Sequence, residues 1–256
     1  MTISRDHPGF NDASYRKRRD FIAKLGNDSS IDIKYTETER LTWWEVSQKL
    51  MKLYPRFACK AYNVSLAASK ITCENIPQLS EINNTLEKKG FSIQPVSGLI
   101  TPRSFLETLE KNVMLCTRYI RHHSVPEYTP EPDIIHEVLG HCVFFHDEKY
   151  RELNRAFGRA ARRACDDSLL RISRIYWYTV EFGLCTENNN VKAYGAGLLS
   201  SLQELSNTNN VEIAPMRFED IAGSSFDTMT THSKLYLSPY TYEKTASIII
   251  DFLESL

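Results

Sequence analysis

Apolar residues recur with helical periodicity along most of the chain, and this pattern predicts a mainly α fold. In 38–54 the apolar side chains fall on one helical face, and Pro55 is expected to end the helix because proline lacks a backbone N–H. Another helix is expected over 101–109, with Thr101 as its N-cap and Pro102 in its first turn. The same periodicity predicts helices over 60–69, 77–89, 132–144, 148–164, 168–182, 196–205 and 242–253.

Only short segments show features typical of strands. Residues 91–96 alternate between apolar and polar side chains, and 113–120 is expected to be extended or mixed. The polar segment 206–235 is expected to be rich in loops, with one or two short strands. Together these elements predict one α+β, mainly α domain over 34–256, large enough to hold an active site.

Residues 1–33 are expected to form a polar N-terminal extension that wraps loosely over the surface. This segment contains a basic run, Arg16 to Arg19. Such a run is more often a solvated face than a nucleic-acid site.

Composition narrows the classes of function. The 256 residues carry a formal net charge of -1, with 42% hydrophobic and 25% charged residues, which is ordinary for a globular protein. This balance gives no electrostatic reason to expect nucleic acid or an acidic membrane as a partner. No apolar run reaches the length of a membrane span or resembles a signal peptide, and the six cysteines lack C-x-x-C pairing. We therefore expect reduced thiols, a cytoplasmic location and a monomer or small homo-oligomer.

Two histidines in the segment 129–141 are the main candidates for chemistry. His136 and His141 lie five residues apart, and Glu137 follows the first of them. A zinc peptidase motif has its histidines four apart, whereas positions five apart on an α-helix diverge by about 140°. The pair can share a metal only if the helix is distorted or ends between them, and Gly140 is the residue expected to permit this. A peptidase zinc site is thus disfavoured, and a metal site of another geometry stays open.

Glu181 is the best candidate for a third ligand. It lies in the aromatic segment 175–183, where a buried carboxylate is costly unless it binds a cation or a strong donor. Two histidines and one carboxylate form the facial triad of non-haem Fe(II) enzymes. Trp177 precedes Glu181 by one helical turn and is expected on the same face. From spacing alone, a zinc hydrolase, a non-catalytic metal-binding protein and ordinary core residues remain alternatives.

Six segments of the chain carry longer motifs, namely 42–55, 75–79, 98–105, 128–141, 175–185 and 191–201. These motifs closely resemble those of the pterin-dependent aromatic amino acid hydroxylases. The resemblance runs from about Lys34 to the C-terminus in family order. It implies a single catalytic domain of that family, without the N-terminal regulatory domain and the C-terminal tetramerisation helix of the animal enzymes.

This resemblance implies roles for individual residues. His136, His141 and Glu181 would bind iron, while Glu137 and Tyr176 would sit beside the iron and the pterin. The ring of Phe105 would stack on the pterin, an arrangement that aromatic faces favour, although it could be a core residue. The pterin edge would contact the backbone of Gly98, Leu99 and Ile100.

The amino acid pocket is implied in the same way. Arg121 would hold the substrate carboxylate with its bidentate guanidinium, although it could instead form a surface ion pair. Ser200 could simply bond to its own helix backbone. The remaining residues that match this pocket are Thr129, Trp177 and Gly197.

The implied reaction is monooxygenation of a free aromatic amino acid with Fe(II), O₂ and tetrahydrobiopterin or a related tetrahydropterin. By the same resemblance, Trp177 and Met229 would lie in the amino acid pocket. Phenylalanine is favoured as the substrate because the indole of Trp177 would narrow the slot and Met229 would offer a phenolic hydroxyl no partner, with tyrosine or tryptophan hydroxylation as alternatives. Pro102 and Ser104 differ from the residues usual in animal phenylalanine hydroxylases. Because proline cannot donate a backbone hydrogen bond, we expect the loop before Phe105 to bind the pterin differently.

Overall fold

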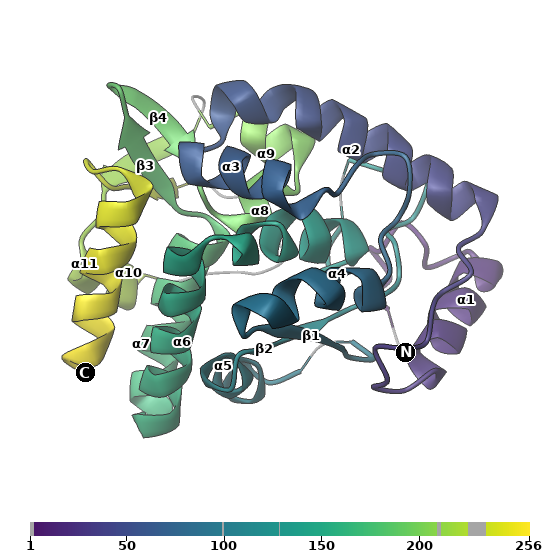
Figure 1. Cartoon of the computed structure of the whole chain (residues 1–256), viewed down its shortest axis with the longest axis horizontal. Coiled ribbons are helices and arrows are strands. Elements are labelled where there is room, and N and C mark those ends of the chain that lie inside the picture. The colour runs from purple at the N-terminus through teal and green to yellow at the C-terminus, as the bar shows by residue number, and fades with distance from the viewer. Residues whose placement is uncertain (1–2, 99, 128, 209–210, 225–233) are drawn as a thin grey trace.

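The computed structural model of the chain describes residues 3–98, 100–127, 129–208, 211–224 and 234–256. It confirms the mainly α architecture, with helices surrounding one continuous apolar core. Figure 1 shows α1 and α11 at opposite ends of the molecule. The α-helices are α1 (Ala13–Lys24), α2 (Glu37–Phe57), α3 (Lys60–Ser69), α4 (Leu79–Leu86), α5 (Pro102–Glu110), α6 (Glu148–Arg163), α7 (Asp166–Tyr176), α8 (Ala196–Leu199), α9 (Leu202–Ser206), α10 (Phe218–Gly223) and α11 (Tyr242–Glu254).

Two small sheets complete the fold. The strands β1 (Ser92–Pro95) and β2 (Val113–Cys116) pair in parallel. The second sheet has the order β4-β3-β6-β5, in which only the β3–β4 pair is antiparallel. Its strands are β3 (Leu184–Glu187), β4 (Asn190–Ala193), β5 (Glu212–Pro215) and β6 (Lys234–Leu237).

The β3–β4 hairpin was not predicted from the sequence. Its two-residue turn is Asn188-Asn189, and both residues adopt positive φ, 51° and 62°. Asparagine tolerates this left-handed conformation better than most residues, so it suits a tight hairpin.

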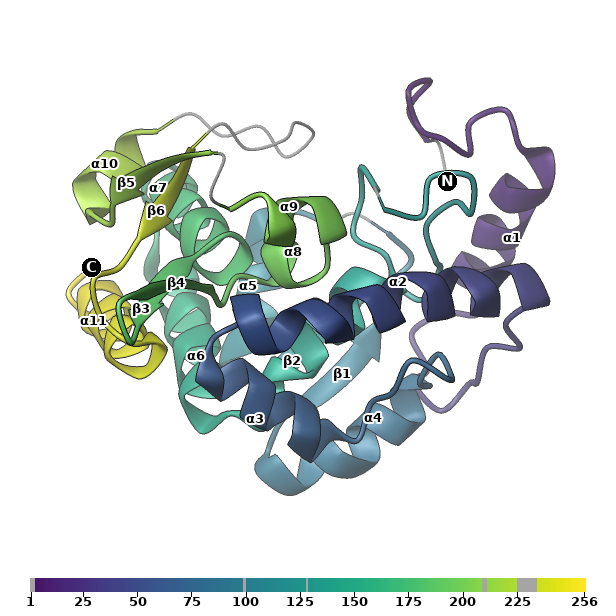
Figure 2. The same cartoon turned by 90° about the horizontal axis from the view of Figure 1, so that it is seen from above.

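The long helix α2 crosses the molecule beside α8 and α9 (Figure 2). It begins with a capping box, in which Thr36 accepts from the Glu39 backbone and Glu39 reaches back to the Thr36 N–H. The prediction that Pro55 ends this helix is wrong, because the helix continues to Phe57. Near the end of a helix, proline removes a single backbone hydrogen bond, and the Ala58 N–H still closes the last turn on Tyr54 O at 2.9 Å.

Other predicted helices divide more finely than expected. The 168–182 helix becomes α7 and a π-helix over Trp177–Glu181, and the 196–205 helix splits into α8 and α9 around Ser200 and Ser201. The polar segment after 206 contains α10, which its composition did not indicate. None of the helices in the described ranges has the length and apolar character required for a membrane span.

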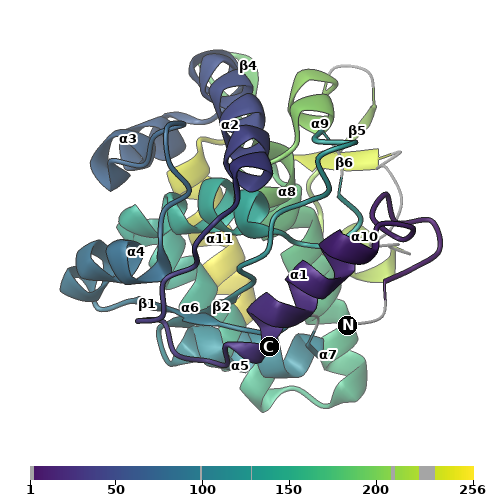
Figure 3. The same ribbon diagram turned by 90° about the vertical axis from the view of Figure 1, so that its right-hand side faces the viewer.

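The expectation that residues 1–33 wrap loosely over the surface is wrong. Helix α1 lies across one side of the domain (Figure 3). Its Arg19 is only 2% exposed, donates to Glu131 Oε2 at 2.5 Å and packs over the Tyr119 ring. Tyr15 donates to Ile120 O at 3.0 Å. The basic run is therefore partly structural, because at least one of its charges is buried in an ion pair; a boundary at residue 33 stays a prediction.

Candidate metal centre

A π-helix, not an α-helix, carries the two candidate histidine ligands. It spans His136–Cys142, and the Val143 N–H donates to Val138 O, five residues earlier, at 3.0 Å. Hydrogen bonds of this spacing widen the helical turn, so that residues five apart come onto one face. The Nε2 atoms of His136 and His141 accordingly lie 3.1 Å apart. The helix is distorted, as the spacing of the histidines required.

Gly140 lies inside this distorted helix, which is one of the two possibilities that its place between the histidines predicted. The helix neither ends nor turns left-handed at Gly140. A Cβ atom placed there would lie 2.8 Å from the Ala196 carbonyl oxygen and 3.0 Å from the Ala196 Cβ. Glycine is therefore needed because α8 packs directly against the π-helix.

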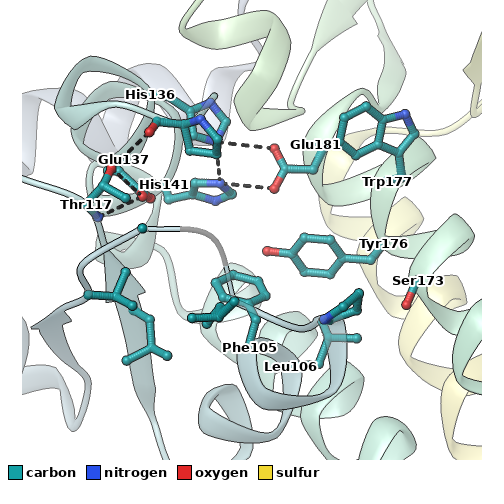
Figure 4. A pocket seen from close by; sticks show the side chains of 16 residues that line it. Phe105, Leu106, Thr117, His136, Glu137, His141, Ser173, Tyr176, Trp177 and Glu181 are labelled. Atoms are coloured by element: carbon teal, nitrogen blue, oxygen red, sulfur yellow. Dashed lines mark hydrogen bonds and ion pairs between the residues drawn. The ribbon is translucent and has the colours of Figure 1, made fainter. Parts of the chain in front are cut away.

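Glu181 completes a triad with the two histidines. It ends the second π-helix, in which the Phe182 N–H donates to Trp177 O at 2.9 Å. Its carboxylate oxygens lie 3.5 Å from His136 Nε2 and 3.2 Å from His141 Nε2. Figure 4 shows the carboxylate facing both rings. One ligand atom from each residue lies within 4.8 Å of the others. This is the only cluster of three such side chains in the described part of the chain.

The far nitrogen of each imidazole is hydrogen-bonded to a hydroxyl group. His136 Nδ1 lies 2.9 Å from Ser200 Oγ, and Ser200 in turn donates to Ala196 O at 2.8 Å. His141 Nδ1 lies 2.8 Å from the Tyr150 hydroxyl oxygen. Both rings are thus oriented with Nε2 toward the shared space.

The electrostatics of the triad suit a cation. Burial lowers the pKa of His136 to about 4, so this ring is neutral near pH 7 and has a free lone pair. Burial also opposes ionisation of Glu181, but the adjacent His141 outweighs it and holds the pKa of the carboxyl below its usual value. Glu181 likewise outweighs burial at His141 and raises the pKa of that ring.

The donor set fits a divalent transition metal. Two imidazole nitrogens and one carboxylate suit non-haem Fe(II), with positions left open for further ligands. The same donors also occur in catalytic zinc sites, so the three residues alone do not distinguish the two metals.

A mostly apolar pocket of about 230 Å³ opens beside the triad. Phe105 and Tyr176 both line it, with their rings edge to face and 5.8 Å between centroids. Gly98 and Ile100 line it as well, whereas Leu99 lies outside the described residues. The structure therefore brings the described candidates for pterin contact to one wall of the pocket that holds the metal ligands.

Glu137 also lines this pocket, next to His136. Its Oε1 accepts from the Thr117 N–H at 2.9 Å and from the Thr117 hydroxyl at 3.1 Å. Burial raises the pKa of Glu137 to about 7, so near neutral pH a large fraction of this carboxyl is protonated and able to donate a hydrogen bond.

Arg121 lies in a buried ion pair instead of the surface ion pair considered as its alternative. Its Nε and Nη2 donate to the two carboxylate oxygens of Asp133 at 2.9 and 2.8 Å, and neither side chain is more than 2% exposed. Asp133 Oδ1 also accepts from the His136 N–H at 3.1 Å. Asp133 therefore connects the guanidinium to the backbone of the first metal ligand.

The other candidates for the amino acid pocket are placed unevenly. Trp177 lines the cavity and packs on Phe182 with 4.8 Å between ring centroids. Thr129 donates its hydroxyl to Glu131 O at 2.7 Å. A Cβ at Gly197 would lie 2.4 Å from the Phe182 ring, so this glycine makes room for that ring. Ser200 is bound to His136 and to its own helix, and Met229 lies outside the described residues.

Comparison with known proteins identifies the family. The family model described as biopterin-dependent aromatic amino acid hydroxylase matches residues 1–256. The chain belongs to this family. Among its curated relatives are a phenylalanine 4-monooxygenase of Pinus taeda, 44% identical over 79% of this chain and 59% of the relative, and a phenylalanine-4-hydroxylase of Caenorhabditis elegans, 42% identical over 79% and 47%. A tryptophan 5-hydroxylase of Xenopus laevis is 36% identical over 99% of this chain and 55% of its own. The chain spans about half the length of these hydroxylases.

Solved hydroxylase structures have the same fold. The apo phenylalanine hydroxylase of Colwellia psychrerythraea 34H superimposes with a TM-score of 0.80 at 26% identity, covering 88% of each chain. The Chromobacterium violaceum enzyme with iron(III) and 7,8-dihydrobiopterin gives 0.79 at 25% identity, covering 87% of this chain and 82% of that one. The expected fold class is confirmed.

Three residues that support the candidate site were not predicted from the sequence. Asp133 could have been found as the buried partner that Arg121 requires, three residues before His136. Thr117, which holds Glu137, lies 20 residues before it, and Tyr150, which holds His141, lies nine residues after it on a separate helix. Neither contact follows from a local sequence pattern, because both are formed only in the folded chain.

Proposed function

We propose that this chain hydroxylates the ring of a free aromatic amino acid, with phenylalanine preferred, using Fe(II), a tetrahydropterin and O₂. One observation carries the proposal: His136, His141 and Glu181 gather their ligand atoms within 4.8 Å on the wall of an apolar pocket. Family membership favours iron over the zinc that the same donors could bind. The partners in this proposal are the amino acid, O₂ and the pterin, all of which are small molecules.

Iron and pterin would supply the activation of O₂, which no protein side chain provides. The protein would bind, orient and shield the reactants. Phe105 would offer its ring to the pterin, and its edge-to-face contact with Tyr176 fixes the ring against the helix that leads to Glu181. Glu137 would present a carboxyl oxygen to the pterin while Thr117 holds the other. The apolar lining would exclude water from the reacting groups.

Arg121 would recognise the carboxylate of the amino acid. Of its five N–H donors, Asp133 takes one from Nε and one from Nη2. The other contacts of the guanidinium are long: Nη1 donates to Pro126 O at 3.4 Å and Nη2 to Ser200 O at 3.5 Å. The Nη1 side of the guanidinium would therefore be the part that binds a second carboxylate. Asp133 would keep the guanidinium oriented for this contact, because the buried bidentate pair fixes its plane.

The preference for phenylalanine rests on Trp177. Its indole lines the pocket and is packed on Phe182, so the slot beside Glu181 is narrowed by a large, fixed ring. A second indole from tryptophan would fit there less well than a phenyl ring. Tyrosine and tryptophan remain alternative substrates, and the relatives include a tryptophan 5-hydroxylase.

A zinc hydrolase or a non-catalytic metal-binding protein is the alternative of a different class. It would bind metal without consuming O₂.

We also propose a cytoplasmic location and a monomer or small homo-oligomer. The six free cysteines support a reducing compartment.

Product analysis tests the proposal. The purified chain is incubated with Fe(II), a tetrahydropterin, O₂ and each of phenylalanine, tyrosine and tryptophan, and products are separated by chromatography. We expect the specificity constant to be highest for phenylalanine, with no product from the Glu181→Ala control. A higher value for tryptophan would overturn the substrate preference alone, whereas metal binding without any hydroxylated product would favour the non-hydroxylase alternative.

A further inference from the structure

Tyr150 places a phenolic hydroxyl against one of the metal ligands. The residue belongs to the first turn of α6 and is fully buried. Its hydroxyl oxygen lies 2.8 Å from His141 Nδ1, nine residues earlier in the sequence. The contact therefore joins the body of α6 to the π-helix that carries both histidines.

The phenol is held rigidly at this position. Its ring stacks on Phe144 at 4.5 Å between centroids and meets Phe145 edge to face at 5.0 Å. Its backbone N–H donates to Asp147 Oδ1 at 2.8 Å, which caps α6. A fully buried ring packed on two sides leaves the hydroxyl little freedom to move away from His141.

Metal binding determines the direction of this hydrogen bond. A histidine that gives the lone pair of Nε2 to a metal carries its proton on Nδ1, and that N–H needs an acceptor. The phenolic oxygen of Tyr150 can accept it. If Tyr150 donated to Nδ1 instead, a neutral His141 would have its proton on Nε2, which would block the ligand position.

His136 shows the same arrangement with a different hydroxyl. Its Nδ1 faces Ser200, whose hydroxyl is committed as a donor to Ala196 O at 2.8 Å and so accepts from the imidazole. Each histidine of the triad is thus backed by one buried hydroxyl group from another part of the chain.

We propose that Tyr150 is a positioning residue for the metal, which orients the His141 ring and holds its proton on Nδ1 so that Nε2 is free to bind. The inference rests on the proposed metal site but not on the identity of the substrate. Removing such a supporting contact typically weakens metal binding about 10- to 100-fold.

Tyr150→Phe is the decisive variant, because it removes the hydroxyl and keeps the ring that stacks on Phe144. Tyr242→Phe is a matched control, since Tyr242 is also fully buried, also packs on Phe144, and has a hydroxyl with no hydrogen-bond partner among the described residues. Metal-free protein is titrated with Co²⁺, a spectroscopic probe of the site, and the dissociation constant is read from the absorption of the bound ion. Thermal melting of the metal-free variants reports on the fold.

We expect Tyr150→Phe to raise the Kd for Co²⁺ about 10-fold or more, with Tyr242→Phe close to the parent. In proton NMR of the Co²⁺ form, the parent should show shifted, slowly exchanging N–H signals from both ligand histidines, and Tyr150→Phe should lose the one from His141. A Kd within about twofold of the parent together with two retained signals would overturn the role of Tyr150 and leave the metal site standing. A parent that binds no Co²⁺ would overturn both.

Discussion

The candidate site has two ends, the triad of metal ligands and the surroundings of Arg121, and they differ in whether their polar groups are already paired within the protein. At the metal end, the Nε2 atoms of His136 and His141 and the Glu181 carboxylate face one another within 4.8 Å, and each imidazole is held from behind by a hydroxyl. At the end expected to bind the amino acid, Arg121 already forms a buried bidentate pair with Asp133. The first end presents three ligand atoms that a cation can bind, whereas at the second end the charge of Arg121 is already paired with Asp133.

This difference indicates what each end contributes. The three ligand atoms of the triad favour metal binding strongly, because a cation offsets the cost of burying a carboxylate between two imidazoles. A guanidinium whose charge is already paired gains less from a second carboxylate, so it contributes orientation and selectivity more than affinity. We therefore expect variants at the metal end to eliminate metal binding. Variants at the Arg121 end should affect both the stability of the fold and recognition of the amino acid.

The largest effect is expected from removing a metal ligand. His136→Ala, His141→Ala or Glu181→Ala should reduce bound iron and turnover to background, because two remaining ligands hold a divalent ion poorly. Iron per chain is measured by elemental analysis, with His146→Gln as a control histidine outside the triad. Full iron and full activity in any of the three alanine variants would show that the residue is not a ligand.

The next largest effect tests the Arg121 end. Asp133→Ala leaves a buried, unpaired guanidinium and should destabilise the fold by about 3–5 kcal/mol in denaturant unfolding. Asp166→Ala, which removes the exposed partner of Arg103, should change stability little. If the two variants had the same free energy of unfolding, the buried pair of Arg121 and Asp133 would not contribute to stability as expected.

A smaller effect is expected where the pterin would stack. Phe105→Ala should raise the Michaelis constant for the pterin several-fold, since an aromatic pair contributes about 0.5–1.5 kcal/mol beyond buried area. The constant for the amino acid should change less. Equal shifts in both constants, or none, would make Phe105 a core residue.

The smallest effect lies outside the site, at His146. Burial, with help from nearby Lys89, lowers the pKa of this ring to about 4. The unfolded chain therefore takes up a proton at higher pH than the folded one, so the stability that neutral His146 permits is present above about pH 6.5 and is lost as the pH falls toward 4. His146→Gln should flatten that part of the curve of unfolding free energy against pH. An unchanged slope would show that His146 does not contribute to the pH dependence of stability.

Local sequence signals predicted the regular helices well. The 60–69 helix has the expected bounds, and Thr101 caps α5 with a hydrogen bond from the Ser104 N–H. These helices depend on residues that are close in the sequence, so the spacing of apolar and capping residues is enough to predict them.

The details of the site depended on contacts that the pattern does not record. The spacing of His136 and His141 showed that an α-helix would not serve, but the π-helix itself is stabilised by packing against α8 at Gly140. Burial of Arg19 in an ion pair with Glu131 likewise depends on residues more than a hundred positions apart. Long-range pairing of this kind is decided by the folded chain.

An iron titration tests the central claim most directly. Metal-free protein is titrated with Fe(II) in the presence of a tetrahydropterin, O₂ and phenylalanine, and the hydroxylated product is measured after each addition. Activity should rise in proportion to iron and stop rising at one iron per chain, with no product when Zn²⁺ replaces iron. Product formation without iron, or equal activity with Zn²⁺, would contradict the assignment of His136, His141 and Glu181 as a catalytic iron site.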